Sequence, residues 1–274
     1  MVTVEIITIG NEILLGLIQD TNSNYLCRVV RGMGGRTRRI TVVRDEIDEI
    51  SAELSSSVSR KADLIVTCGG LGPTDDDLTL TAVAAATGQP ISLHQDARDF
   101  VEQKYRALAD AGFVSTGEMN DARLKMARLP EGAAMIENPV GAAPAVWIKH
   151  LGTRIVCLPG VPAELKAIVE GPLQKLLGEM FGVGSYREAE ILVECGDESQ
   201  LASSLRQVAA AHPEVYIKSR ASRFGPAVRF RIMTSATATT PDGADAKVQQ
   251  AVSELIRVLA EAGIRTVPSK SIVP

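Results

Sequence analysis

A glycine-rich segment followed directly by three carboxylates has the residue types and spacing for chemistry. It reads Cys-Gly-Gly-Leu-Gly-Pro-Thr-Asp-Asp-Asp over residues 68–77. Glycines at the start of a helix leave backbone N–H groups open to an anion, often a phosphate. Three aspartates repel a bare phosphate, but Mg²⁺ binds one or two carboxylates together with phosphate oxygens and water. The segment therefore predicts a site for a metal-bridged phosphate or pyrophosphate.

Helix capping is the alternative explanation of the same segment. Thr74 and Asp77 have the spacing of a capping box. Acidic residues in a first helical turn also interact favourably with the helix dipole, by ~0.3–1 kcal/mol each. Capping accounts for one or two of the aspartates, but neither for the third nor for the glycines before them.

Three further segments follow predicted strands and belong to the same rim. They are Gly10-Asn11-Glu12, Arg44-Asp45-Glu46 and Pro159-Gly160-Val161-Pro162. In an open parallel sheet, ligands bind beyond the carboxyl ends of the strands, where such loops converge. Asn138–Pro144 forms a rigid proline-bordered loop, which is either a further part of the site or a simple turn before a strand at Ala145–Ile148.

The elements that position these segments alternate between short β-rich runs and helical patterns. Strands are expected at Val2–Ile9, Arg38–Val43, Asp63–Cys68 and Thr153–Leu158. Helices are expected at Asp20–Met33, Glu46–Arg60, Asp77–Thr87, Ala97–Ala111 and Pro162–Met180, the last with a break at Gly171-Pro172. This alternation predicts an α/β fold with three layers, in which helices cover both faces of a mainly parallel sheet.

A second, smaller α+β domain is expected after a linker at 181–185. Its strands are predicted at Glu190–Cys195, Val215–Lys218 and Ala227–Met233, and its helices at Glu198–Ala210 and Asp245–Ala262. The domains are therefore placed at residues 1–180 and 186–268.

The composition of the chain disfavours several classes of protein, namely nucleic-acid-binding, membrane-spanning and secreted proteins. The 274 residues carry a net charge of −4, which disfavours bulk binding to nucleic acid. No apolar run approaches the ~18 residues of a membrane span, and no signal peptide is evident, so we expect a cytoplasmic chain. The four cysteines form no Cys-x-x-Cys pair and are expected to be reduced, with Cys68 and Cys157 buried. None of the three histidines is expected to be catalytic.

Together these motifs resemble the CinA (competence/damage-inducible) family, whose N-terminal domain belongs to the molybdopterin-binding superfamily. The resemblance spans residues 4 to about 170, and residues 185–265 resemble the small middle domain of that family. The matching segments are Ile9–Gly16, Asp20-Thr21-Asn22, Gly69–Thr79, Asn138–Pro144 and Pro159–Glu164.

The resemblance implies metal-dependent hydrolysis of a nucleotide diphosphate of the ADP-ribose type. It implies that Asp76, Asp77 and Glu12 are catalytic and that Asp75, Asp76, Asp77 and Glu12 hold Mg²⁺, Mn²⁺ or Co²⁺. The expected ligand and phosphate contacts are Gly10, Asn11, Gly69, Gly70, Gly72, Thr74, Asn138, Gly141, Pro159 and Gly160. The alternative is a module without catalysis that binds a pterin or nucleotide phosphate for a partner.

The sequence departs from the family pattern at several points. Asn11 stands where Asp is frequent, which weakens any metal site there, and Ala142 stands where Thr is usual. Full-length relatives carry a C-terminal nicotinamide-nucleotide amidohydrolase domain that has no counterpart here, so we expect this chain not to deamidate nicotinamide mononucleotide. The resemblance also implies a homo-oligomer, either a dimer or a trimer.

A basic run in the second domain has two explanations. Lys218, Arg220, Arg223, Arg229 and Arg231 fall in a segment without acidic residues. Such a segment would suit RNA, but the Gly-x-x-Gly loop of KH domains and stacking aromatics are missing. We favour a solvated sheet face or a subunit contact, and nucleic acid is not an expected partner.

Overall fold

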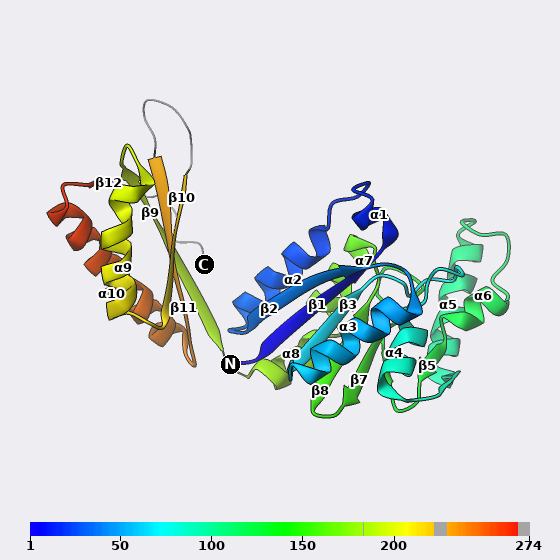
Figure 1. Cartoon of the computed structure of the whole chain (residues 1–274). Coiled ribbons are helices and arrows are strands. Elements are labelled where there is room, and N and C mark those ends of the chain that lie inside the picture. The colour runs from blue at the N-terminus through cyan, green and yellow to red at the C-terminus, as the bar shows by residue number, and fades with distance from the viewer. Residues whose placement is uncertain (183, 222–228, 268–274) are drawn as a thin grey trace. The chain divides into compact units, whose positions relative to one another are not determined.

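The computed structural model describes residues 1–182, 184–221 and 229–267, which form two units (Figure 1). The first unit comprises residues 1–30 and 35–180, and the second comprises residues 31–34 and those from Phe181 onward. Each unit has its own sheet. Among the described residues, no helix combines the length and apolar character needed to cross a membrane.

The first unit is built on a six-stranded sheet in the order β2-β1-β3-β8-β7-β6. Strands β2, β1, β3 and β8 run parallel to one another, whereas β7 is antiparallel to both β8 and β6. The strands are β1 (Thr3–Ile9), β2 (Arg36–Val43), β3 (Leu64–Cys68), β6 (Ala134–Ile136), β7 (Ala145–His150) and β8 (Thr153–Leu158). All five residues of β3 are buried, as expected for a strand covered on both faces.

Helices cover the two faces of this sheet, as the strand alternation predicts (Figure 1). On one face, Ile7 and Ile65 share a core with residues of α3 (Ile47–Ser59) and α4 (Thr79–Thr87). On the other face, the Thr8 hydroxyl lies 2.8 Å from that of Ser23 in α2 (Thr21–Gly32). The three-layer α/β architecture is therefore confirmed.

Several element boundaries differ from the expectations. The predicted break near Gly171 is confirmed, because α7 (Pro162–Glu170) ends there and α8 (Gln174–Phe181) follows. Helix α4 begins at Thr79 rather than Asp77. The helix that was expected at Ala97–Ala111 is observed as α5 (Gln95–Asp110). The short elements of the first unit that were not predicted are α1 (Asn11–Leu14), β4 (Ile91–Leu93), α6 (Asp121–Lys125), β5 (Arg128–Pro130) and β6.

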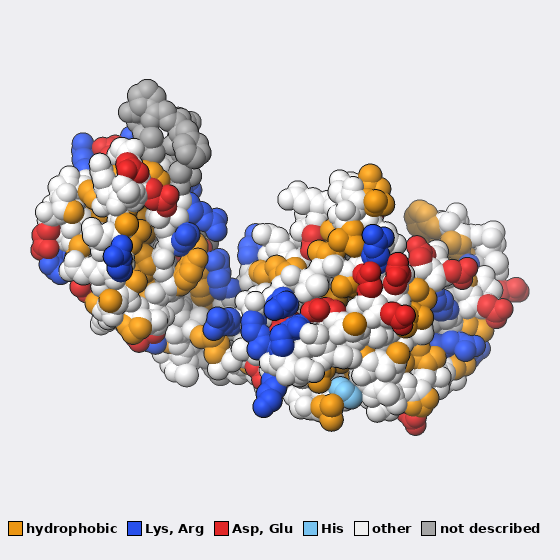
Figure 2. Space-filling view, in the orientation of Figure 1, with side chains coloured by type: hydrophobic (Ala, Val, Ile, Leu, Met, Phe, Trp, Pro, Cys, Tyr) orange, Lys and Arg blue, Asp and Glu red, His pale blue; other side chains and the backbone are white. Residues whose placement is uncertain are grey.

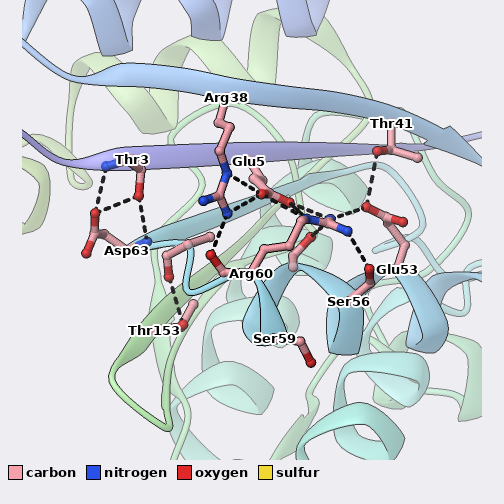
Figure 3. A network of polar contacts seen from close by, with 12 residues as sticks. Thr3, Glu5, Arg38, Thr41, Glu53, Ser56, Ser59, Arg60, Asp63 and Thr153 are labelled. Carbon is pink, nitrogen blue, oxygen red and sulfur yellow. Dashed lines mark hydrogen bonds and ion pairs between the residues drawn. The ribbon is translucent and has the colours of Figure 1, made fainter.

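A buried carboxylate joins three elements of the first unit (Figure 3). The Glu5 side chain in β1 has no exposed surface, and Arg38 of β2 and Arg60 after α3 both donate hydrogen bonds to it. Burial raises the pKa of Glu5, but hydrogen bonds from Arg60, Ser57 and Arg38 outweigh burial and hold it at about 2. Glu5 is therefore ionised at neutral pH.

The second unit carries a four-stranded antiparallel sheet in the order β10-β11-β9-β12, with helices on one face (Figure 1). Phe230 and Ile232 pack against Leu255 and Leu259 of the long terminal helix. The strands are β9 (Ser185–Glu194), β10 (Val215–Ala221), β11 (Arg229–Ala238) and β12 (Arg265–Val267). The helices are η1 (Glu198–Leu201), α9 (Ala202–Ala211) and α10 (Pro241–Glu261).

The basic run lies on the opposite face of this sheet, beside acidic neighbours. Arg229 forms an ion pair with Glu194 at 3.1 Å, and Arg231 with Glu190 at 3.3 Å. Both glutamates belong to β9, so the cationic character of the linear segment is partly neutralised by the adjacent strand. Arg223 lies outside the described residues.

Candidate functional site

A cleft of about 640 Å³ lies at the carboxyl ends of the parallel strands. The segments after β1, β2, β3 and β8 all contribute to its wall, as the sequence predicts. Figure 2 shows acidic side chains gathered on the first unit where these strands end. Of the expected site residues, the following line the cleft: Gly10, Glu12, Gly69, Gly70, Gly72, Asp76, Asp77, Pro159 and Gly160.

The glycine loop is positioned by close backbone contacts. Gly69 and Gly70 have φ angles of +107° and +68°, in the region that favours glycine. A Cβ on Gly69 would lie 2.3 Å from the Ile9 carbonyl oxygen, and one on Gly70 would lie 2.2 Å from the Thr79 hydroxyl. These two glycines are therefore required for packing, whatever the ligand.

The hydrogen bonds of this loop revise the expected phosphate contacts. The Gly69 N–H donates to the Leu158 carbonyl at 3.0 Å, so it is not available to a phosphate. The N–H groups of Gly70, Leu71 and Gly72 have no hydrogen-bond acceptor in the described part of the chain. The open donors are thus those of residues 70–72.

The Thr74–Asp77 segment is a turn, and the capping explanation is wrong. Because α4 begins at Thr79 with Leu78 at its N-cap position, Thr74 lies outside the helix. Asp77 instead braces the turn, since its Oδ2 accepts hydrogen bonds from the Thr74 N–H (2.9 Å) and hydroxyl (2.6 Å). A Cβ on Gly72 would be 2.6 Å from that same oxygen, so the Asp77 carboxylate lies against the glycine loop.

The other two aspartates of this turn differ in position. Asp76 lines the cleft and accepts a hydrogen bond from the Thr74 hydroxyl. This bond, the Asp76 backbone N–H and the nearby charge of Lys125 lower the pKa of the Asp76 carboxyl. Asp75 is exposed, and neither it nor Thr74 lines the cleft.

Glu12 reaches the cleft through the short helix α1. Its side chain folds back over Gly10, where a Cβ would lie 2.5 Å from Glu12 Oε1. Asn11 does not line the cleft; its N–H donates to Asp45 Oδ2 at 2.7 Å. Asn11 is thus a link to the loop after β2, which itself lines the cleft through Asp45.

The Asn138 loop contributes Ala142 and Ala143 to the cleft wall, whereas Asn138 itself supports the wall without lining it. Asn138 is fully buried and does not line the cleft, and neither does Gly141. Its Nδ2 donates to the Ala143 carbonyl at 2.8 Å and to Glu164 Oε2 at 2.7 Å. Asn138 therefore holds its own loop and orients the carboxylate of Glu164, which does line the cleft.

Several lining residues were not assigned a role from the sequence. Asp20 and Glu164 lie within the segments that carry the family resemblance, and Asp45 directly follows a predicted strand, so a signal for them existed. The apolar part of the wall includes Ile13 and Leu71, which also lie in those segments. It further includes Ile18, Tyr105 and Met126, to which no sequence signal pointed. The Arg123 guanidinium stacks 3.9 Å from the centroid of the Tyr105 ring and orients it.

The charge on the cleft wall is entirely negative. Its ionisable lining consists of six carboxylates, the buried Cys68 and Tyr105, without lysine, arginine or histidine among the described residues. The carboxylates are Glu12, Asp20, Asp45, Asp76, Asp77 and Glu164. Burial raises the pKa of the Cys68 thiol, so Cys68 is not a thiolate nucleophile.

The carboxylates fit a cation only in small groups. Within the described residues, no three His, Cys, Asp or Glu side chains are arranged to hold a metal ion. Asp76 and Asp77 do converge, because both carboxylates lie within hydrogen-bond distance of the Thr74 hydroxyl, whose single proton they share. One or two carboxylates are what Mg²⁺ needs when phosphate oxygens and water complete its coordination.

The comparisons with known proteins agree with this architecture. Residues 5–179 match the family described as probable molybdopterin binding domain. A Thermococcus kodakarensis protein is 39% identical over 221 residues, which are 81% of this chain and 86% of that protein. An Aeropyrum pernix protein is 37% identical over 263 residues, or 94% of each chain.

A solved structure is also similar to the first unit. The protein CinA from Thermoplasma acidophilum, described as having unknown function, is 35% identical with a TM-score of 0.58. The match covers 64% of this chain and 98% of that one. With its cleft at the strand ends and its glycine–aspartate loop, the chain belongs to the molybdopterin-binding domain family and is related to CinA.

Proposed function

We propose that the cleft hydrolyses the pyrophosphate bond of a nucleotide diphosphate that arrives with a divalent cation. One observation carries this proposal: the cleft combines open N–H donors at residues 70–72 with six carboxylates, and no cationic side chain is among its described lining residues. Such a wall repels a free polyanion and accepts one whose charge a metal ion has neutralised.

Asp76 and Asp77 are the residues that would hold the cation. When bound there, Mg²⁺, Mn²⁺ or Co²⁺ supplies charge neutralisation and lowers the pKa of a bound water. Asp77 is preorganised for this role by its two hydrogen bonds from Thr74. Because the pKa of Asp76 is lowered, its carboxylate stays ionised at pH values at which an ordinary aspartate begins to take up a proton.

The remaining wall suits the organic part of such a substrate. The N–H groups of residues 70–72 would bind phosphate oxygens. Ile13, Ile18, Tyr105 and Met126 would contact a planar heterocycle, since aromatic and apolar side chains favour flat rings. With no histidine in the lining, a carboxylate such as Glu12 is the group that would accept a proton.

A second function is favoured by the family itself. Because the matching family is described as a probable molybdopterin binding domain, the cleft could hold a pterin phosphate without catalysis. The same apolar wall and N–H donors would serve a pterin ring and its phosphate.

Turnover and binding separate the two functions. We expect the purified chain to release AMP from ADP-ribose in the presence of Mg²⁺, Mn²⁺ or Co²⁺, measured by chromatography. Calorimetry with the same nucleotide and metals reports binding independently. Metal-dependent binding of the nucleotide without AMP release under all three metals would reject hydrolysis and favour the binding module.

A further inference from the structure

A second groove of about 620 Å³ opens near the amino ends of the parallel strands β3 and β8 in the first unit. It lies where β7, β8 and the start of β3 meet α8 (Figure 1). Asp63, which directly precedes β3, lines it, whereas the cleft lies at the carboxyl ends of the parallel strands. The two sites therefore share no residue.

Two cations face each other in this groove. Lys149 and Arg154 are directly paired in the antiparallel register of β7 and β8, so both side chains lie on one face of the sheet. Like charges in directly opposed positions destabilise a strand pair. Neither cation has an ion pair with a carboxylate in the described part of the chain.

A buried donor lies beside them. Trp147 is two residues before Lys149 on the same strand, lines the groove and is 6% exposed. Its indole Nε1 is buried and has no hydrogen-bond partner among the described residues. A buried N–H without an acceptor costs about 1–3 kcal/mol, so an acceptor oxygen at this position would stabilise the chain.

The acids of the groove do not meet this requirement. Asp63 Oδ2 already accepts hydrogen bonds from the N–H and the hydroxyl of Thr3, both at 2.7 Å, and the bonds from Thr3 lower the pKa of Asp63. Glu179 on α8 is exposed and makes no ion pair with either cation. Three groups of the groove can only donate hydrogen bonds: the buried indole of Trp147, the exposed ammonium of Lys149 and the half-buried guanidinium of Arg154.

We propose that this groove binds a small oxyanion, a phosphate or carboxylate group, between Lys149, Arg154 and the indole of Trp147. The anion would relieve the repulsion of the two opposed cations and accept the buried N–H. This proposal does not depend on hydrolysis in the cleft, because it rests on different residues at the opposite end of the parallel strands.

The single tryptophan of the chain makes the test specific. Emission of Trp147 is followed during titration with inorganic phosphate and, separately, with acetate, at ionic strength held constant with chloride. We expect a saturable change with at least one oxyanion. The Lys149→Gln and Arg154→Gln variants should each have an affinity for the oxyanion that is lower by about tenfold or more, because each removes a charge-assisted hydrogen bond.

Two further variants complete the experiment. Lys175→Gln, an exposed lysine on α8 that does not line the groove, should bind like the wild type. Lys149→Gln should also melt at an equal or higher temperature without anion, and phosphate should raise its melting temperature less than that of the wild type. A response no different from chloride, or unchanged affinity in both groove variants, would overturn the proposal.

Discussion

At the scale of single residues, neighbouring aspartates have separate tasks. Asp77 braces the turn after the glycine loop through Thr74, Asp76 points its carboxylate to the cleft, and Asp75 is exposed outside it. The family resemblance implies that all three hold the metal and that, of the three, only Asp76 and Asp77 are catalytic. Their division of labour follows from the turn geometry, in which Thr74 contacts two of the three.

This division predicts a contrast between adjacent substitutions. Asp76→Asn should fold normally and lose metal-dependent turnover of ADP-ribose by about 100-fold or more, because a carboxylate facing the cation is removed. Asp75→Asn is the matched control, with the same charge change one residue away, and should retain turnover. Melting curves verify folding of both variants. Equal activity in the two variants would contradict the assignment of Asp76 to the cation.

The glycines of the loop give a second prediction. Gly70→Ala places a Cβ 2.2 Å from the Thr79 hydroxyl and forces alanine to φ +68°. Gly88→Ala imposes nearly the same φ, +67°, where nothing lies within 4 Å of the new Cβ. Urea unfolding should show that Gly88→Ala costs about 1 kcal/mol. Gly70→Ala should cost distinctly more, and equal losses would show that the contact with Thr79 is unimportant.

At the scale of elements, the sheet and its major helices follow from periodicity, but the fine structure of the site does not. Apolar runs such as that of β3 and the break at Gly171 are local signals. The start of α4 is set by tertiary contact, since the Thr79 N–H donates to the Gly70 carbonyl and its hydroxyl to the Gly69 carbonyl. Tyr105 reaches the cleft through the packing of α5, which no local pattern reveals.

The ion network that joins β1, β2 and the end of α3 predicts a dependence of stability on pH. The pKa of Glu5 is held at about 2 in the folded chain, below its ordinary value of 4.5. Unfolding therefore requires proton uptake at low pH, and the stability that Glu5 contributes is present above pH 4.5 and lost as the pH falls toward 2. The free energy of unfolding from urea titrations should decline over this interval.

The Glu5→Gln variant isolates this contribution. Removing the carboxylate leaves Arg38 and Arg60 without their buried partner, which should cost about 3–5 kcal/mol at pH 7. The variant should also lose part of the decline in stability between pH 4.5 and 2. Glu49→Gln is the control, because its ion pair with Arg44 is exposed at 3.8 Å and should contribute less than about 1 kcal/mol. Equal losses in the two variants would show that the burial of Glu5 is unimportant.

At the scale of the whole molecule, the two units have separate cores, and the cleft is lined by residues of the first unit. The cleft draws every lining residue from the span Thr8 to Glu164, and the hydrophobic core of the second unit consists of residues from Ile191 onward. A solved CinA chain that corresponds to 64% of this one is matched over 98% of its own length, so a chain of about the size of the first unit folds by itself.

The last prediction follows from that separation. A fragment of residues 1–180 should fold and bind ADP-ribose with Mg²⁺, Mn²⁺ or Co²⁺ as tightly as the whole chain, within about threefold, because it keeps all six cleft carboxylates and the open donors of residues 70–72. Circular dichroism and melting verify folding, and calorimetry measures affinity. A folded fragment that binds far more weakly than the whole chain would show that the second unit contributes to the site. The fragment with Asp76→Asn is the control, since it should lose metal-dependent binding in either case.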